Sequence, residues 1–195
     1  MGMEFEVKFS ATKEVLSILR EKAEGQEKHF QMRTTYYDTI TKDLSARHWT
    51  LRCRQENETA VCTLKYPLDG DARGEVEVVC DSIEAAIPML CKQSGLAELE
   101  SLTAQGVVPV CGAAFHRVAK TFTFEGTTME LALDEGVLMG GGKELPLFEV
   151  EVELKEGDLQ QVRTYAAILA ATYGLKPQPR SKFRRALDLK ESQDV

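Results

Sequence analysis

The chain has 195 residues, of which 43% are hydrophobic, and a formal net charge of −7. This length is typical of one domain, and we expect a single domain over residues 1–195. The acidic balance argues against a nucleic-acid binder that relies on a broad basic surface. No apolar run approaches the roughly 20 residues that cross a bilayer, so we expect no membrane partner.

Five cysteines and three histidines are widely spaced along the chain. The cysteines include no Cys-x-x-Cys pair, so their pattern predicts neither a zinc site nor a disulfide framework. Reduced thiols favour a cytoplasmic location. We interpret His29, His48 and His116 as surface or structural residues rather than as ligands or catalytic bases.

The first predicted strand covers residues 4–9 and alternates charged and apolar side chains. Glu4, Glu6 and Lys8 share one face, and the residues between them are apolar. Taken alone, the charged face has a simple interpretation as the solvated side of a half-buried strand. The same arrangement recurs along the chain, however, and therefore needs a common explanation.

A helix is predicted over residues 12–24, with Thr12 as its N-cap and Gly25 as its stop. A strand rich in β-branched and aromatic residues follows over residues 31–39. Residues 40–47 are predicted to form a turn or an irregular piece.

Three further strands are predicted over residues 49–55, 60–66 and 73–80, and each again alternates polar and apolar side chains. Their polar faces hold Arg52 and Arg54 in the first strand, Thr63 and Lys65 in the second, and Arg73, Glu75 and Glu77 in the third.

A second helix is predicted to begin at Asp81 or Ser82, with Glu84 placed as in a capping box. Pro88 lies inside its apolar pattern and predicts a kink or a late start. Gly95 is predicted to end it. Residues 96–112 are ambiguous between a short helix and a strand-like run.

Strands are next predicted over residues 115–125, which carry Arg117 and Lys120, and over residues 129–134, which carry Glu130 and Asp134. Arg117 and Lys120 are out of phase, so both face the same side only if a bulge intervenes.

The loop with three glycines at 140–142 is interpreted as a hairpin loop, because no helix follows it to complete a phosphate cradle. The last long strand, residues 147–155, places Glu149, Glu151 and Glu153 on one face. A helix capped by Asp158 and ended by Gly174 follows it, and a last short helix starts near Lys182.

The signs of the charged faces cluster by strand: the first and late strands are acidic, and the middle strands are basic. Alternating carboxylates on one strand repel each other unless a cation lies among them. Mg²⁺ takes oxygen ligands from carboxylates and substrate phosphates, and guanidiniums suit phosphate oxygens. A barrel closed with its charges inward would therefore suit a metal-bound polyphosphate.

The ordered set of motifs resembles the CYTH superfamily, the triphosphate tunnel metalloenzymes, over essentially the whole chain. The similarity is greatest to the CYTH domain of bacterial inorganic triphosphatases. The motifs are Glu4-x-Glu6-x-Lys8, Tyr36-Tyr37-Asp38-Thr39, Leu51-Arg52-Cys53-Arg54, Thr63-Leu64-Lys65, Arg73-x-Glu75-x-Glu77, Arg117-x-x-Lys120, Glu130-x-Ala132-x-Asp134, Glu149-x-Glu151-x-Glu153 and Ser181-Lys182.

The resemblance implies an α+β, mainly antiparallel fold: an eight-stranded closed barrel with a charged interior, flanked by helices. It also implies the roles of the charged residues. The catalytic group would be Glu4, Glu6, Lys8 and Asp134. The triphosphate would be held by Lys8, Arg52, Arg54, Lys65, Arg117, Lys120 and Lys182. Mg²⁺ or Mn²⁺ would be held by Glu4, Glu6, Asp134, Glu149, Glu151 and Glu153. The tunnel would be shaped by Arg73, Glu75, Glu77 and Glu130.

The function expected from this resemblance is hydrolysis of inorganic triphosphate, a small-molecule substrate, by a monomer or homodimer. A class IV adenylate cyclase, a thiamine triphosphatase and a non-catalytic polyphosphate-binding module are the alternatives. Trp49 could bind a thiamine ring, although a Trp beside an alternating strand is more often a core residue. The simplest alternative is a β-sheet protein whose charged face is only solvated and binds no substrate.

Overall fold

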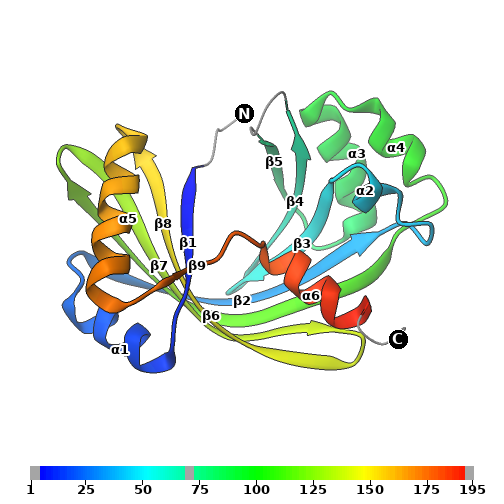
Figure 1. The fold of residues 1–195 in the computed structure, drawn as a ribbon. Helices are drawn as coiled ribbons and strands as arrows, with labels where there is room; N and C mark the ends of the chain where they lie inside the picture. Colours follow the sequence, from blue (N-terminus) through cyan, green and yellow to red (C-terminus); the bar gives the residue numbers. More distant parts are fainter. Residues whose placement is uncertain (1–4, 69–72, 192–195) are drawn as a thin grey trace.

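The computed structural model describes residues 5–68 and 73–191, which form one antiparallel sheet with helices packed on both of its faces (Figure 1). The strands are β1 (Glu6–Ser10), β2 (Gln26–Asp38), β3 (Thr50–Glu56), β4 (Thr59–Pro67), β5 (Arg73–Val79), β6 (Val108–Phe124), β7 (Thr127–Gly140), β8 (Lys143–Glu156) and β9 (Lys176–Pro177). The helices are α1 (Lys13–Lys22), α2 (Asp43–Ala46), α3 (Ile83–Ser94), α4 (Ala97–Leu102), α5 (Leu159–Tyr173) and α6 (Lys182–Glu191).

The strand order is β5-β4-β3-β2-β6-β7-β8-β1-β9. The sheet curls strongly, so that its two ends approach each other and its inner face is concave (Figure 1). This confirms the expected mainly antiparallel sheet flanked by helices. The described residues form nine strands rather than eight, because the two-residue β9 pairs with β1. In the described part of the chain, backbone pairing does not join β5 to the opposite end.

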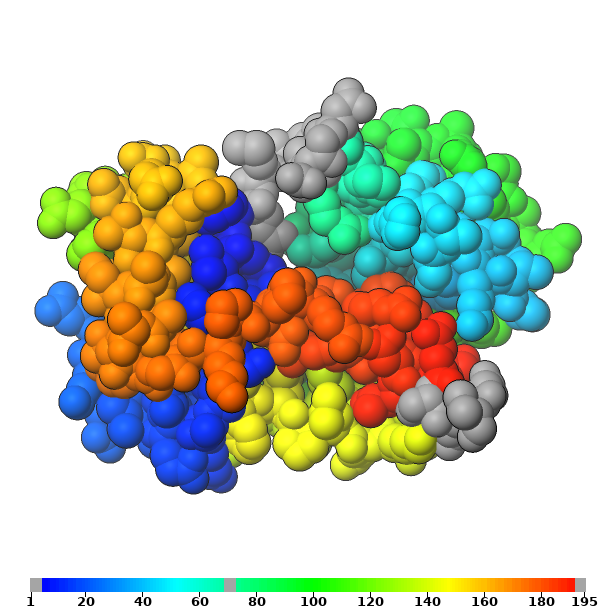
Figure 2. Space-filling model, viewed as in Figure 1, coloured from blue at the N-terminus to red at the C-terminus, as the bar shows by residue number. Residues whose placement is uncertain are grey.

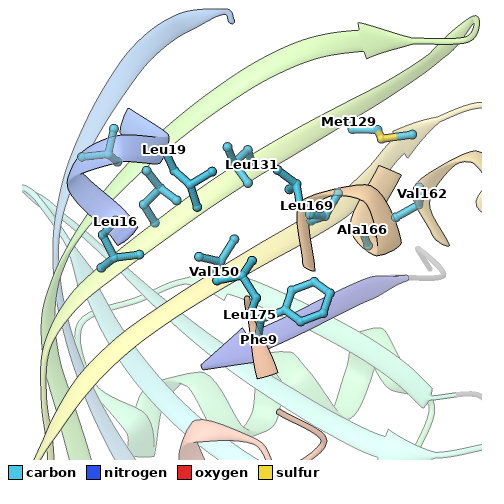
Figure 3. Close-up of a cluster of buried hydrophobic side chains, with 13 residues drawn as sticks. Phe9, Leu16, Leu19, Met129, Leu131, Val150, Val162, Ala166, Leu169 and Leu175 are labelled. Carbon is cyan, nitrogen blue, oxygen red and sulfur yellow. The ribbon is translucent and has the colours of Figure 1, made fainter. Parts of the chain in front are cut away.

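One half of the outer face is covered by α1 and α5 (Figure 3). Leu16 and Leu19 of α1 and Val162, Ala166 and Leu169 of α5 recur at the helical spacing of three or four, which gives each helix one apolar stripe. These stripes pack on the alternate apolar positions of the sheet, such as Leu131 and Val150. The outward residues of β1, including Phe9, belong to this core, so its charged residues must face inward.

The other half of the outer face is covered by α2, α3 and α4, which pack on β3, β4 and β5. Leu51, Leu64 and Val76 point outward from these three strands into a core that includes Leu90 of α3. Trp49 is 7% exposed and belongs to the same core. The core interpretation of Trp49 is therefore confirmed.

The last helix, α6, packs inside the curve of the sheet rather than outside it (Figure 1). Ala186 joins Met32, Phe115, Leu138 and Leu147 in a third cluster on the inner face. The helix lies so close to the end of β7 that a Cβ at Gly140 would collide with the backbone oxygen of Ala186. The inner face is therefore apolar beneath α6 and charged beyond it.

The local signals of helix ends agree with the structure. Thr12, Ser82 and Asp158 cap α1, α3 and α5 by accepting a hydrogen bond from a backbone N–H of the first turn. Gly174 ends α5 with φ of 64°. α3 begins at Ile83 and contains Pro88, so the predicted alternative of a late helix start is wrong. In the described residues, no helix is long and apolar enough to span a membrane.

Several strands are longer than their sequence pattern predicted. β6 has 17 residues and β7 has 14, whereas the alternation was clear only over residues 115–125 and 129–134. The difference has a physical cause: where α6 covers the inner face, both faces of these strands are apolar. The pattern of period two is lost there, although the strands continue.

Candidate functional site

The charged positions of β1, β7 and β8 meet on the inner face because the register aligns them. Asp134 of β7 pairs with Glu149 of β8, and Lys8 of β1 pairs with Glu151 on the other side of β8. Asp134 and Glu149 are fully buried, and Glu151 is 7% exposed. Burial of three neighbouring carboxylates is costly unless cations compensate them.

These three carboxylates form a compact cluster, which we call the acidic cluster (Asp134, Glu149 and Glu151). One oxygen from each residue lies within 4.8 Å of one oxygen from each of the others. Carboxylate oxygens at this spacing are the ligands that hard divalent cations such as Mg²⁺ prefer. The donor set therefore fits a divalent cation.

Three cationic side chains compensate the acidic cluster. The Lys182 ammonium lies 2.9 Å from Asp134 and 2.7 Å from Glu151, and it also contacts Glu149. Arg117 donates two hydrogen bonds of 2.7 Å to Asp134 and a further one to Glu151. Arg185 donates to Glu149. Three positive side chains thus stand against three negative ones.

The electrostatic environment separates the two glutamates of the cluster. Burial raises the pKa of Glu149, and this outweighs the opposing effect of Lys182. Burial also acts to raise the pKa of Glu151, but Lys182 and Arg117 outweigh it and hold that pKa well below its usual range. For Lys182, burial acts to lower the pKa, but Asp134, Glu151 and Glu149 outweigh it and raise that pKa. The Lys182–Glu151 pair is therefore fully charged at neutral pH.

On the part of the inner face formed by β3 and β4, three basic side chains (Arg52, Arg54 and Lys65) form what we call the basic wall. Among the described residues, the ion pairs of Arg52 are long, at 3.7 Å to Glu75 and 3.6 Å to Glu77. Its buried Nε atom has no hydrogen-bond partner among the described residues. Such an orphaned donor is rare in proteins and favours a ligand with acceptor oxygens.

Arg54 adds a second guanidinium to the basic wall. Its Nε donates to Thr34 Oγ1 at 3.1 Å, and its Nη1 lies 3.5 Å from Glu56. Burial and the neighbouring Arg52 charge lower the pKa of Arg54. Two guanidiniums that repel each other in a buried place would be stabilised by an anion between them. Lys65 differs, because it already pairs with Glu75 at 3.1 Å.

Glu6 and Lys8 both lie on the inner face of β1, as expected. The Lys8 ammonium lies 2.9 Å from Glu6, so the two charges compensate each other. Glu153 pairs in register with Glu6 on one side and Glu130 on the other, and Lys155 lies 2.9 Å from Glu153 and 3.5 Å from Glu130. Glu153 and Glu130 thus lie next to the acidic cluster rather than within it. Glu4 lies outside the described residues.

Two expected positions need correction. Lys120 lies on the outer face, where its ammonium donates to the backbone oxygens of Arg20 and Ala23 at 2.6 and 2.8 Å. The pairing of β6 with both neighbours is regular from Arg117 to Lys120, so the bulge that would turn Lys120 inward is absent. Arg73 is exposed at the start of β5 and donates to the backbone oxygen of His48. Lys120 therefore does not join the charged inner face, and the Arg73 guanidinium binds the backbone of the turn before β3.

Arg185 was missed by the sequence interpretation. It stands three residues after Lys182, and residues three apart on a helix share a face. Like Arg52, it has a buried Nε without a hydrogen-bond partner in the described part of the chain. The basic run around Lys182 was the available signal, but the pattern alone did not show which side chains point into the sheet.

A curled antiparallel sheet (Figure 1) thus carries buried carboxylates on the inner side of β7 and β8 and guanidiniums on the inner side of β3, and the space-filling view shows α6 at the front of this arrangement (Figure 2). The CYTH domain model matches residues 2–187. The chain therefore belongs to the CYTH domain family.

Among curated proteins, the inorganic triphosphatase of Haemophilus influenzae is 29% identical over 137 residues, which cover 69% of this chain. The chain spans only 39% of the length of that protein.

Among solved structures, a Hippeastrum protein is described as a proposed adenylyl cyclase with a dominant triphosphatase activity. It matches with a TM-score of 0.65 and 20% identity over 96% of this chain and 97% of that one. A proposed adenylate cyclase from Bacillus halodurans has a TM-score of 0.64 and 19% identity, over 94% and 96% of the two chains. A Pyrococcus horikoshii protein has a TM-score of 0.62 and 22% identity, over 96% of this chain and 99% of that one. At these identities the similarity shows the shared fold.

Proposed function

We propose that this chain hydrolyses inorganic triphosphate to pyrophosphate and phosphate in a metal-dependent reaction on its inner face. The observation that carries the proposal is the buried acidic cluster facing a basic wall whose guanidiniums have few partners. The inorganic triphosphatase relative and the family membership support the same reaction class.

The substrate class follows from the chemistry of the basic wall. Arg52 and Arg54 present planar donors at adjacent inward positions of one strand, and phosphate oxygens accept from such donors in pairs. A triphosphate has several charged oxygens in a row and would meet both guanidiniums together with Lys65. A neutral or singly charged ligand would offer Arg52 and Arg54 fewer acceptor oxygens than their guanidiniums can use.

The acidic cluster would hold the metal, with Glu6 of β1 as an additional candidate, together with Glu4, which precedes the described residues. We propose Mg²⁺ or Mn²⁺ because all of the donors are carboxylate oxygens, which suit hard cations. When bound, the metal would neutralise phosphate oxygens and make a water molecule a better nucleophile.

Charge balance explains how substrate and metal would fit together. The acidic cluster is already compensated by Lys182, Arg117 and Arg185. A metal that arrives alone must compete with these fixed cations. A metal that arrives with triphosphate brings oxygens to which the three cations can turn, so each ion pair is exchanged for another rather than lost.

The residues of the chain would act mainly by positioning and electrostatic stabilisation. Hydrolysis forms a bond between a water oxygen and one phosphorus and breaks one P–O–P bridge, with the bridging oxygen leaving on pyrophosphate. Guanidinium and ammonium groups that are held in place compensate the charge that gathers on these oxygens. His29 and His116 lie on the outer face, so neither is placed to act as a base in this reaction.

The alternative substrates have less support. A thiamine ring would need an aromatic partner, and Trp49 is buried in the outer core. The cyclase reaction is named for several solved proteins of the same fold, but no residue set in the described part of the chain marks an adenine pocket. We also propose a cytoplasmic location, because all five cysteines are free thiols.

The test is phosphate release from tripolyphosphate, thiamine triphosphate and ATP, with Mg²⁺, with Mn²⁺ and with a chelator. Cyclic AMP is measured in the ATP reactions. We expect fast hydrolysis of tripolyphosphate that the chelator abolishes. Formation of cyclic AMP as the main product would contradict the proposal, and so would tight binding of tripolyphosphate without turnover.

The matched variants are Arg54→Met and Arg33→Met. Arg54 belongs to β3 and Arg33 to the neighbouring strand β2. Arg54 points to the inner face, whereas Arg33 is exposed on the outer face. We expect Arg54→Met to lose most of the activity and Arg33→Met to keep it. Equal activity of the two variants would show that the inner charged face is merely solvated.

A further inference from the structure

A pair of histidines lies on the outer face of the sheet, away from the acidic cluster. His29 of β2 and His116 of β6 come together because His116 pairs with Gln31, two residues from His29 on the same side of β2. The His29 Nδ1 and His116 Nε2 atoms are 3.2 Å apart. The two rings are nearly parallel, with centroids 5.2 Å apart.

This nitrogen spacing matches the bite of a single metal ion. Imidazole nitrogens bind Zn²⁺ at about 2.0–2.1 Å, so two of them that subtend an angle between 90° and the tetrahedral value lie about 2.9–3.4 Å apart. The observed 3.2 Å lies inside that interval. Both histidines are partly exposed, so water could supply the remaining ligands.

A carboxylate lies behind one of the two rings. The other nitrogen of His29, Nε2, lies 3.1 Å from a Glu27 oxygen. Metal-binding histidines usually donate their second ring N–H to such a carboxylate, which fixes the tautomer and makes the ligand more basic. With its proton on Nε2, His29 presents a lone pair on Nδ1, toward His116.

Glu27 is itself held in place by two cations. Arg20 donates to both of its oxygens at 3.1–3.2 Å, and the Lys120 ammonium lies 3.5 Å away. The residue placed directly opposite His116 in β7 is Glu135, whose carboxylate lies 2.8 Å from Lys13. A small hollow of about 80 Å³ is lined by His116, Glu135 and Arg20, among others. These are the charged groups that surround the histidine pair.

We propose that His29 and His116 form a binding site for a borderline transition-metal cation such as Zn²⁺. Without metal, His116 donates its Nε2 proton to His29 Nδ1. On binding, this proton moves through solvent to His116 Nδ1, and both facing lone pairs coordinate the cation. The site is chemically distinct from the acidic cluster, because imidazole suits Zn²⁺ whereas carboxylates suit Mg²⁺.

The small number of histidines makes a direct test possible. The chain has three, so the imidazole NMR spectrum contains three sets of signals. The protein is titrated with Zn²⁺ in millimolar Mg²⁺, which competes with Zn²⁺ for the carboxylates of the inner face. We expect the signals of His29 and His116 to shift together at one equivalent, while those of His48 stay in place.

Variants connect these signals to affinity. His29→Gln and His116→Gln should each lower Zn²⁺ affinity by about tenfold or more, and Glu27→Gln by about tenfold. His48→Asn is the matched control, because His48 lies in a turn with φ of 58° and asparagine tolerates that conformation. Zn²⁺ should also raise the melting temperature of the wild-type protein but not that of His29→Gln.

Two results would overturn the proposal. One is that saturating Zn²⁺ leaves the His29 and His116 signals unchanged, which would make their contact a hydrogen bond between neutral rings and nothing more. The other is that both histidine variants bind Zn²⁺ as tightly as the wild-type protein, which would place the ion elsewhere. Neither result bears on hydrolysis of triphosphate, since the variants leave the inner face untouched.

Discussion

Arg117 and Asp134 face each other directly across β6 and β7, and two hydrogen bonds of 2.7 Å join the guanidinium to the carboxylate. Asp134 is fully buried, and Arg117 is nearly so. This bidentate pair fixes one carboxylate of the acidic cluster, and Lys182 contacts the same residue from α6. The geometry of the cluster therefore depends on both the sheet and the last helix.

We predict that Asp134→Asn lowers hydrolysis of tripolyphosphate by about 100-fold or more, because it removes a proposed metal ligand and one negative charge. The amide keeps the shape and one acceptor, so the fold should persist. Phosphate release and a thermal melt measure the two effects. Asp188→Asn serves as the control, since Asp188 pairs with Arg184 on the surface of α6. Activity near the wild-type level in Asp134→Asn would exclude Asp134 from the site.

We predict that Lys182→Met destabilises the metal-free protein by about 3–5 kcal/mol, because three buried carboxylates lose their shared cation. Mg²⁺ should recover part of this loss by taking the place of the ammonium. The measurement is chemical denaturation with and without Mg²⁺. Lys190→Met on the exposed side of the same helix should change little. An unchanged stability of Lys182→Met without metal would show that the cluster does not need this cation.

We predict that Lys120→Met lowers stability by about 1.5–3 kcal/mol, the range for hydrogen bonds to a charged group, and leaves the KM for tripolyphosphate unchanged. Lys120 binds carbonyl oxygens of α1 on the outer face. Arg54→Met should do the opposite, raising KM with a smaller effect on stability. Denaturation curves and steady-state kinetics of the two variants provide the comparison. A raised KM in Lys120→Met would restore this residue to the tunnel.

We predict that metal and substrate strengthen each other's binding. Lys182, Arg117 and Arg185 compete with a metal for the acidic cluster until phosphate oxygens offer them new partners. Coupling of this kind is reciprocal, and each ligand typically raises the binding affinity of the other by about 5–150-fold. Calorimetric titration of Mn²⁺ with and without a non-hydrolysable triphosphate analogue measures it. Equal Mn²⁺ affinity in both titrations would contradict the exchange of ion pairs.

We predict that two of the five cysteines resist alkylation in the folded protein. Burial raises the pKa of Cys111 to about 12, opposed only in part by Lys190, and burial also raises the pKa of Cys62. The reactive form is the thiolate, so both thiols should be nearly inert at pH 8. Peptide mapping after timed exposure to iodoacetamide gives the rates, and denatured protein gives the reference. Labelling of either cysteine at the denatured rate would contradict this expectation.

Much of the inner face could be predicted from alternation alone. In a strand, a residue and its second neighbour share a face, so Glu149 and Glu151 had to lie together, as did Arg52 and Arg54. The caps Thr12 and Asp158 were also readable, because a helix start depends on a few adjacent residues. These features are local, and local rules determine them.

The full lengths of β6 and β7 could not be predicted from the sequence in the same way. Their ends lie under α6, where Phe115 and Leu138 are apolar although they face inward. The sequence pattern that marks a strand depends on what covers each face, and here α6, which is distant from β6 and β7 in the sequence, provides that cover. Arg185 was missed for the same reason, since its role follows from the docking of α6.

The side on which Lys120 lies was a matter of register. Lys120 is three residues from Arg117 in β6, so the alternation of the strand places the two side chains on opposite faces. Only a bulge between them could have brought both to the inner face. The structure shows regular pairing there, so phase decides the outcome. The contact of His29 with His116 is likewise a product of pairing, because these residues are far apart in the chain.

By itself, the sequence determined which residues alternate, where helices start and which strands carry acid or base, because these depend on residue type and near neighbours. The tertiary structure alone decided which strands lie side by side, where α6 docks and which cations compensate Asp134, Glu149 and Glu151. Those relationships join positions as distant as Lys8 and Glu151, and only the pairing of strands and the burial of apolar faces bring them together.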